Sequence, residues 1–325
     1  MRGVERQFGV MHSRRTPAAC LPFFWLVLGI GGCESLPPPV LTSAEEHRTE
    51  IERWQNRRVA ELREPDSWLS LVGLFWLAQG ENPVGSDPAM AVVLPGDDVP
   101  PWVGTLTLRG QGSFEYALSP SVLALHPPEN AEPVHFRVDA PGPPPVFRWG
   151  TLGWFVIERF GQYGVRLRDS AAPAFQDFHG IDRYPTDAGW RILGRFERYD
   201  PPREIPSPNV LDVPSTSSSP GAVVFEVDGQ EYRLDVTGNP DSRRFSVVFG
   251  DETNGEETYG GGRFLSVEAP FEGDWIVIDF NRAYNPPCVF TAYATCPLPP
   301  PQNKLTLRVE AGEKMYFGGA HREGH

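Results

Sequence analysis

From Ser67 onward, the chain is divided into short runs of alternating apolar and polar residues, each ended by glycine or proline. The chain has 33 Gly and 35 Pro, too many for a helical protein, because both residues favour turns over helix interiors. Runs such as 154–159 and 275–280 are rich in β-branched and aromatic residues, as strands are. This pattern predicts an all-β fold, mainly antiparallel, built as sandwich-like or barrel-like units.

One helix is predicted before the strands. Residues 34–41 form a proline-bearing tether, and residues 42–64 carry a thin apolar stripe among charged residues. Ser43 and Glu46 make a capping box at the start of this helix, and Pro65 ends it. A helix of this kind is expected to pack as an arm against the β structure.

The β-rich part is too long for one hydrophobic core, so two β units are expected. The proline-rich stretch 141–145 is the predicted boundary, between a first unit at residues 65–142 and a second at 143–320. Residues 205–220 are rich in Ser and Pro and are predicted to form a mobile loop.

Residues 1–33 have the layout of a secretory signal peptide, with a basic section followed by the apolar run 21–30. That run is too short to span a membrane. The ending Ile-Gly-Gly-Cys33 resembles a bacterial lipobox, which implies a lipid on Cys33; an ordinary cleaved signal is the alternative. Met1 and Met11 are both possible starts, and Glu34 favours the outer membrane. We therefore expect an envelope protein that faces the periplasm and contacts the membrane through its lipid.

The charge balance of the chain limits the kinds of partner that it can bind. With 29 Lys and Arg against 42 Asp and Glu, the net charge is −13, which would repel nucleic acid and anionic membrane surfaces. After export and lipidation, Cys288 and Cys296 are the remaining cysteines, and a disulfide between them is expected. Half of a zinc site is the alternative, although no CxxC or HExxH partner is present. No cofactor or metal is expected.

The segment 279–303 combines charged and aromatic residues, both of these cysteines and several prolines, and a long loop of this kind is often functional. Within it, Arg282 would keep the Asp279 carboxylate ionised, which leaves Asn281 to orient a ligand. Arg166 and Arg168 alternate on one face of a probable strand and suit a carboxylate or phosphate, or else form structural ion pairs. The predicted ligand-binding residues are Arg166, Arg168, Asp169, Tyr259, Arg263, Asp279, Asn281, Arg282, Tyr284 and Asn285.

Candidate catalytic residues are few. His179, Asp279 and Glu257 could take acid or base roles, but no histidine stands in a metalloprotease motif and no serine in a nucleophile-elbow motif. Glu257 lies in the acidic stretch 251–257, which is predicted to be a solvated hairpin turn.

Two resemblances to known families follow from longer strings. Residues 71–88 and 92–95 resemble the opening of forkhead-associated domains; Ser86 stands where those domains have arginine, so the resemblance implies a β-sandwich without phosphopeptide chemistry. From about Trp54 to Lys314 the chain resembles the bacterial domain-of-unknown-function family DUF1684, which implies no known reaction. The strings that carry this second resemblance are Trp68–Trp76, Gly85–Pro88, Tyr163–Asp169, Thr258–Leu265, Asp279–Cys288 and Ala294–Pro301.

Two functions are compatible with these observations. The first is a lipid-anchored binding or scaffold protein for a small anionic ligand, a glycan or a protein partner, because a stiff, cross-linked loop suits preorganised binding. The alternative is a hydrolase that uses Asp279, His179 or Glu257, with or without a divalent metal.

Overall fold

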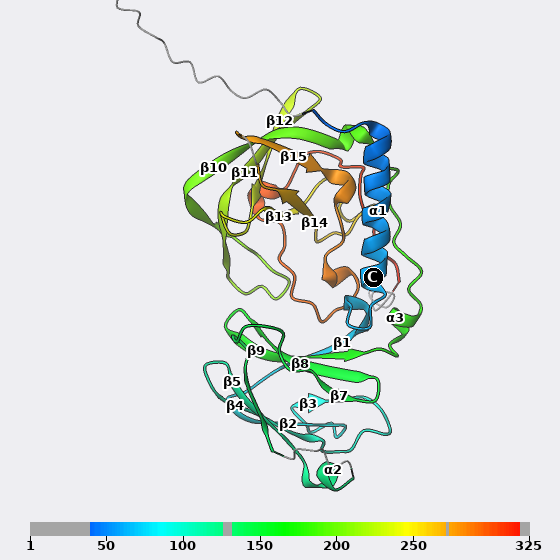
Figure 1. The fold of residues 1–325 in the computed structure, drawn as a ribbon, viewed down its shortest axis with the longest axis vertical. Helices are drawn as coiled ribbons and strands as arrows, with labels where there is room; N and C mark the ends of the chain where they lie inside the picture. The colour runs from blue at the N-terminus through cyan, green and yellow to red at the C-terminus, as the bar shows by residue number, and fades with distance from the viewer. Residues whose placement is uncertain (1–39, 126–131, 271–272, 319–325) are drawn as a thin grey trace, which may run out of the picture. The chain divides into compact units, whose positions relative to one another are not determined.

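The computed structural model describes residues 40–125, 132–270 and 273–318, all within one compact unit of residues 37–325. The predicted signal peptide and Cys33 lie outside the described residues. The described part is made mostly of antiparallel strands, without a closed barrel, so the predicted all-β class is confirmed (Figure 1). No helix in the described part of the chain is long and apolar enough to cross a membrane.

Residues 71–169, here called the sandwich, form two sheets, with strand orders β3-β2-β4-β5-β6 and β1-β9-β8-β7. The strands are β1 (Leu71–Trp76), β2 (Gly80–Gly85), β3 (Val92–Val93), β4 (Gly104–Gly110), β5 (Ser113–Leu118), β6 (Val134–Arg137), β7 (Phe147–Trp149), β8 (Leu152–Arg159) and β9 (Gln162–Asp169). The short helix α2 (Pro120–Leu125) follows β5.

The two sheets of the sandwich share one core. Leu106 and Phe114 of one sheet pack in the same buried cluster as Trp154 and Leu167 of the other. The alternating burial of β4, in which every second residue of its first five is buried, is the period-2 pattern of the sequence. Residues on both sides of the proline-rich stretch 141–145 contribute to this core.

Residues 191–311, here called the C-terminal β unit, have a second core, which includes Phe245, Phe249 and Phe280. Its sheets have the orders β12-β11-β10-β15 and β13-β14. The strands are β10 (Arg191–Pro206), β11 (Thr216–Val227), β12 (Gln230–Val236), β13 (Arg244–Phe249), β14 (Arg263–Glu268) and β15 (Trp275–Asp279).

The predicted loop 205–220 is shorter in the structure. β10 continues to Pro206 and β11 begins at Thr216, and these two residues pair directly. The prediction was wrong at both ends of the loop because backbone pairing between the two strands outweighs the weak strand preference of Ser and Pro.

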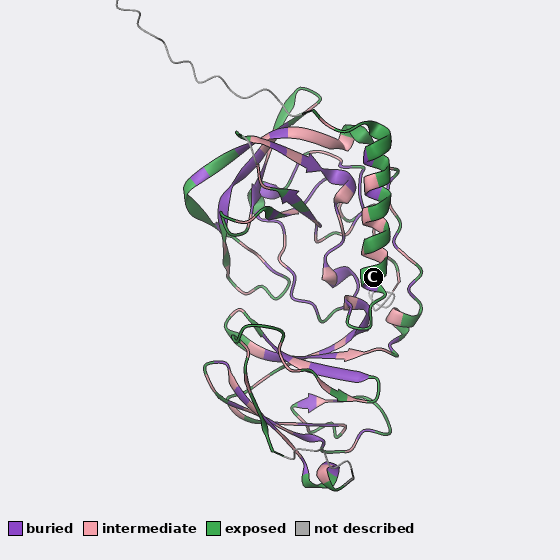
Figure 2. Ribbon diagram, viewed as in Figure 1, coloured by how far each residue is buried: buried purple, intermediate pink, exposed green. Residues whose placement is uncertain are grey.

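The predicted helix is present as α1 (Ala44–Leu62), and Ser43 and Glu46 form the predicted capping box. His47, Ile51 and Leu62 are its buried residues, and most of its outer face is exposed (Figure 2). Leu62 packs in a cluster that includes residues of the segment after β15, so α1 packs as the predicted arm. The one-turn helix α3 (Pro173–Gln176) follows the sandwich.

Candidate functional site

The segment 279–303 is mostly buried rather than exposed. Cys288 and Cys296 pair as a disulfide with their Cα atoms 6.2 Å apart, so the predicted bridge is confirmed. Both cysteines are buried, so the bridge fixes an interior segment instead of a surface loop. In residues 40–125, 132–270 and 273–318, no group of three or more His, Cys, Asp or Glu side chains is placed to hold a metal ion.

Asp279, at the end of β15, is surrounded by hydrogen-bond donors. His47 Nε2 lies 2.8 Å from Asp279 Oδ2, and the Asn281 side-chain amide donates to Asp279 Oδ1 at 3.0 Å. Arg282 contacts the same carboxylate at 3.5 Å and also reaches Glu50 of α1 at 3.3 Å. Asp279 and Arg282 therefore both attach α1 to the end of β15, and the Asp279 carboxylate already has internal hydrogen-bond partners.

The contact between His47 and Asp279 was not predicted from the sequence, because the two residues are 232 positions apart. One feature of the sequence does indicate that His47 is buried: it stands four residues before Ile51, on the apolar stripe of the helix. In the structure His47 is 1% exposed, and its Nδ1 atom is buried with no hydrogen-bond partner among the described residues.

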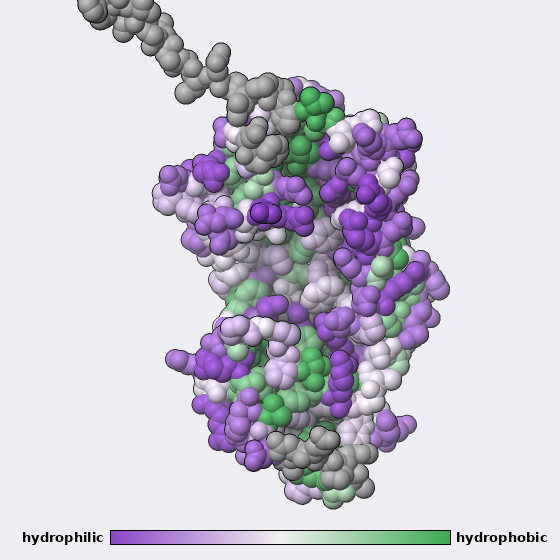
Figure 3. Space-filling model, viewed as in Figure 1, coloured by the Kyte–Doolittle hydropathy of each residue, from purple (hydrophilic) through white to green (hydrophobic). Residues whose placement is uncertain are grey.

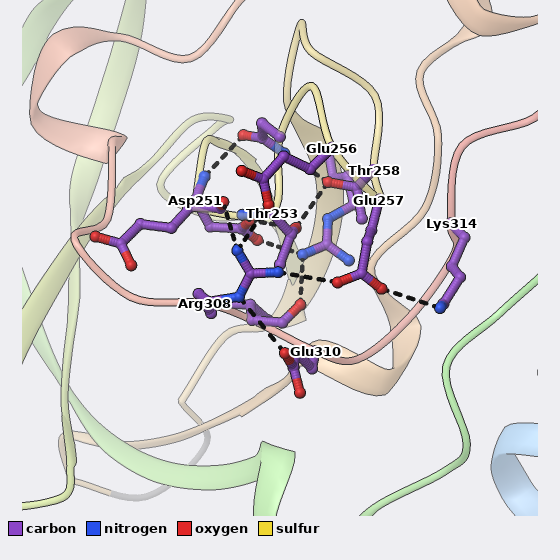
Figure 4. Close-up of polar contacts among 12 residues, drawn as sticks. Asp251, Thr253, Glu256, Glu257, Thr258, Arg308, Glu310 and Lys314 are labelled. Atoms are coloured by element: carbon purple, nitrogen blue, oxygen red, sulfur yellow. Dashed lines mark hydrogen bonds and ion pairs between the residues drawn. The ribbon is translucent and has the colours of Figure 1, made fainter.

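Glu257 belongs to a network of ion pairs at the acidic turn (Figure 4). Arg308 contacts Glu256 at 3.0 Å and Glu257 at 2.9 Å, and Lys314 donates to Glu257 at 3.1 Å. The hydrogen bond from Lys314 lowers the pKa of the Glu257 carboxyl group. Glu257 is thus held ionised between two cations, which does not suit a general acid.

Arg263 has a structural position. Its guanidinium is fully buried, forms an ion pair with Asp251, and donates to the carbonyl of Val309 at 2.8 Å. Gly262 precedes it with φ at 84°, and a Cβ at that position would approach Phe249 O to 2.6 Å. The glycine run therefore allows the close approach of two backbones.

Tyr284 and Asn285 also have internal partners. The guanidinium of Arg58 lies 4.9 Å from the centre of the Tyr284 ring. The backbone amide of Asn285 donates to the buried carboxylate of Glu313 at 2.8 Å. Tyr284 therefore fixes the segment after β15 against α1, and Asn285 fixes it against Glu313 near the C-terminal end of the described residues.

The other predicted residues are dispersed. Tyr259 packs beside the disulfide, and Asp169 accepts a hydrogen bond from the backbone amide of Ala171 at 2.9 Å. His179 is exposed. The three catalytic candidates, His179, Asp279 and Glu257, thus have different neighbouring residues.

The side chains of several arginines share the outer face of the β1-β9-β8-β7 sheet. Val165 and Leu167 of β9 point into the core, so the residues between them point outward. Paired residues of antiparallel strands share a face: Arg166 pairs with Phe155, and Arg168 pairs with Gly153. We call this surface the arginine face; its residues are Arg148 of β7, Arg159 of β8, and Arg166 and Arg168 of β9.

Arg166 is the most unusual member of the arginine face. It is 5% exposed, its guanidinium lies 4.9 Å from the centre of the Trp68 ring, and its Nη2 lies 3.5 Å from Thr295 Oγ1. No carboxylate of the described residues lies within 4.0 Å of it, and its Nε is buried with no hydrogen-bond partner there. Burial, together with the nearby Arg159 and Arg168, lowers the pKa of Arg166 to about 10.

The arginine face has little counter-charge. Arg168 lies 3.9 Å from Asp66, whose side chain is 77% exposed, and this is the one ion pair of the arginine face among the described residues. Burial lowers the pKa of Arg168, whereas Asp66 raises it. In a chain of net charge −13, a face with several arginines and one exposed carboxylate is suited to bind an anion.

Part of the chain matches a known protein family. Residues 176–314 match the family described as "Protein of unknown function (DUF1684)". Residues 176–314 belong to this family. A solution NMR structure of an uncharacterised protein from Haloarcula marismortui is 30% identical, covers 43% of this chain and 78% of that chain, and has a TM-score of 0.37. No curated protein matches the chain.

The DUF1684 region contains the segment 279–303, the disulfide and the acidic turn. The arginine face lies before it in the sequence, yet Thr295 of the DUF1684 region contacts Arg166. The strings before residue 176 that resemble this family lie outside the match. The stretch that resembles forkhead-associated domains also lies outside it, and the resemblance to forkhead-associated domains is not confirmed and stays a prediction.

Proposed function

We propose that this protein is a lipid-anchored protein of the cell envelope that binds a small ligand bearing a carboxylate or phosphate group on the arginine face. The observation that carries the proposal is Arg166, which is 5% exposed and has no carboxylate within 4.0 Å among the described residues. A buried guanidinium without a counter-charge is costly, so a site of this kind is retained where a ligand supplies the charge.

The surroundings of Arg166 support binding of an anion. Arg168 lies two residues away on the same face, and Trp68 covers the guanidinium plane. A planar guanidinium held by an aromatic ring is preorganised to donate two parallel hydrogen bonds to a carboxylate or phosphate. The Nε of Arg166 and the Nε of Arg168 are both buried without a partner in the described part of the chain, so donors remain for the ligand.

The hydrolase alternative gains less support from the same contacts. Asp279 is held by His47 and Asn281, and Glu257 is held by Arg308 and Lys314. A general acid or base must reach a proton of the substrate, and these carboxylates already have internal partners.

The test measures the thermal stability of the purified protein against rising concentrations of inorganic phosphate, pyrophosphate or malonate. Ionic strength is held constant with chloride, because general screening also changes stability. We expect at least one of these anions to raise the melting temperature in a saturable way. Arg166→Met should abolish this increase.

Arg109→Met is the matched control, since Arg109 is an exposed arginine of the other sheet that pairs with Glu115. It should respond to the anions as the wild type does. If Arg166→Met and the wild type respond equally to all three anions, the proposal is wrong.

A further inference from the structure

The sandwich contains a cavity of about 550 Å³, and Arg148 of the arginine face is also among its lining residues. Its walls include Tyr116 of β5, Phe147 and Trp149 of β7, Trp154 of β8 and Val122 of α2. A volume of this size lies within the range of roughly 300–1,000 Å³ that is typical of sites for small molecules.

The wall of this cavity is aromatic. The ring centres of Tyr116 and Phe147 are 4.2 Å apart, and the ring centre of Trp154 lies 6.3 Å from each of them. The three rings come from both sheets, at the edge where β7 ends the β1-β9-β8-β7 sheet. Aromatic rings that meet in this way offer both faces and edges to a planar molecule.

Two polar atoms in this wall have no hydrogen-bond partner in the described part of the chain. Tyr116 is 4% exposed and Trp154 is 2% exposed, and both the Tyr116 hydroxyl and the Trp154 Nε1 are buried without a hydrogen-bond partner among the described residues. Buried hydroxyl and indole N–H groups usually have a partner, so two orphans beside one cavity need an explanation. Burial raises the pKa of Tyr116, so its hydroxyl stays protonated and is available as a donor.

The chemistry of the lining indicates the class of ligand. Apart from the two orphan donors, the cavity is mainly apolar, and Asp98 and Arg148 also contribute to its lining. An acceptor oxygen on the ligand would satisfy Tyr116 and Trp154, and the opposite charges of Asp98 and Arg148 in the lining favour a ligand without net charge. We propose that this cavity binds a neutral, mainly aromatic small molecule that carries a carbonyl or similar acceptor oxygen.

This inference does not depend on the proposed anion site: Arg148 belongs to both the arginine face and the cavity lining, but the donors used here are Tyr116 and Trp154, not Arg166 or Arg168. The test uses two fluorescent probes with the full-length protein. Prodan is a neutral naphthalene that carries a carbonyl group, and N-phenyl-1-naphthylamine is a neutral aromatic probe that lacks an acceptor oxygen. Saturable binding of prodan, with a blue shift of its emission, is expected.

The variant Tyr116→Phe separates hydrogen bonding from apolar packing. It should weaken prodan binding by a factor of about ten, the size of one lost hydrogen bond in a dry site, and change the binding of the second probe less than twofold. Tyr232→Phe, which removes the hydroxyl of a tyrosine in the C-terminal β unit, is the matched control and should leave both affinities unchanged.

A second variant tests the location. Val122→Trp fills the cavity and should abolish the binding of both probes, with far-UV circular dichroism used to show that the protein is folded. Absence of saturable prodan binding to the wild type overturns the inference. So does an equal change of both probe affinities in Tyr116→Phe, or undiminished binding by folded Val122→Trp.

Discussion

Replacement of Arg166 by methionine is expected to stabilise the protein when no anion is bound. The reason is that Arg166 is 5% exposed and has no carboxylate within 4.0 Å in the described part of the chain. Burial and the neighbouring arginines lower its pKa from the ordinary arginine value to about 10, and this difference corresponds to about 3 kcal/mol of unfavourable free energy for the charged form, at 1.36 kcal/mol per pKa unit. Methionine fills the same apolar space without a charge.

Part of this gain is offset by lost contacts. The guanidinium lies 4.9 Å from the centre of the Trp68 ring, a cation–π contact that contributes roughly 1–2 kcal/mol when it is desolvated. The 3.5 Å contact with Thr295 is at the limit of a hydrogen bond and contributes little. The net expectation is that Arg166→Met raises the free energy of unfolding by about 1–2 kcal/mol.

The sign of the pH dependence follows from the lowered pKa. Because Arg166 has a lower pKa in the folded state than in the unfolded chain, its destabilising effect is fully present below pH 10 and is relieved between about pH 10 and 12.5. At neutral pH the whole difference between Arg166→Met and the wild type should therefore be visible.

Urea unfolding at pH 7, in chloride buffer without other anions, measures this difference. The midpoint should rise with an unchanged slope, because the surface exposed on unfolding is nearly the same. In an anion that binds, at about 100 times its dissociation constant, the wild type gains about 2.7 kcal/mol, and the order of stability should reverse or become equal. A variant that is less stable than the wild type in chloride alone would show that Arg166 is a structural residue and refute the reasoning.

Three other variants test separate parts of the structure. Arg263→Ala leaves the buried carboxylate of Asp251 without its partner and should lower the free energy of unfolding in urea by about 3–5 kcal/mol. Adding Asp251→Asn should restore part of that loss. A decrease below about 1 kcal/mol for Arg263→Ala would contradict the buried ion pair. Replacing Cys288 and Cys296 by serine removes a bridge with a sequence separation of 8 and should lower the free energy of unfolding by about 2–3 kcal/mol, and an unchanged melting temperature in non-reducing buffer would count against the bridge. Cys33→Ser should move the protein from the membrane fraction to the soluble fraction, and equal amounts of both proteins in the membrane fraction would argue against lipidation.

Several features of the fold were predictable because they depend on local sequence. The helix α1 begins at the capping box of Ser43 and Glu46, two residues that are only three positions apart in the sequence. The alternation of Arg166 and Arg168 with Val165 and Leu167 was also visible, because side chains of a strand point to opposite faces in turn.

The candidate site was only partly predictable. The sequence indicated that Arg166 lies on a strand face, but the absence of a nearby carboxylate depends on residues brought close by folding, including Thr295, which is 129 residues away. The same applies to Asp279, which contacts His47 across 232 residues. A contact over so many residues leaves no periodic pattern in the sequence, and so Asp279 was interpreted as part of a ligand-binding or catalytic site.

Hydrophilic side chains cover much of the surface in Figure 3, as the acidic composition predicts. The sequence by itself determined the all-β class, the helix with its cap, the disulfide pair and the acidic charge, because each follows from neighbouring residues or from composition. Only the tertiary structure decided which polar residues are internally paired, which arginine is buried with no carboxylate nearby among the described residues, and that three aromatic rings line a cavity. Those properties depend on desolvation and on distances in space, which are fixed when the sheets pack.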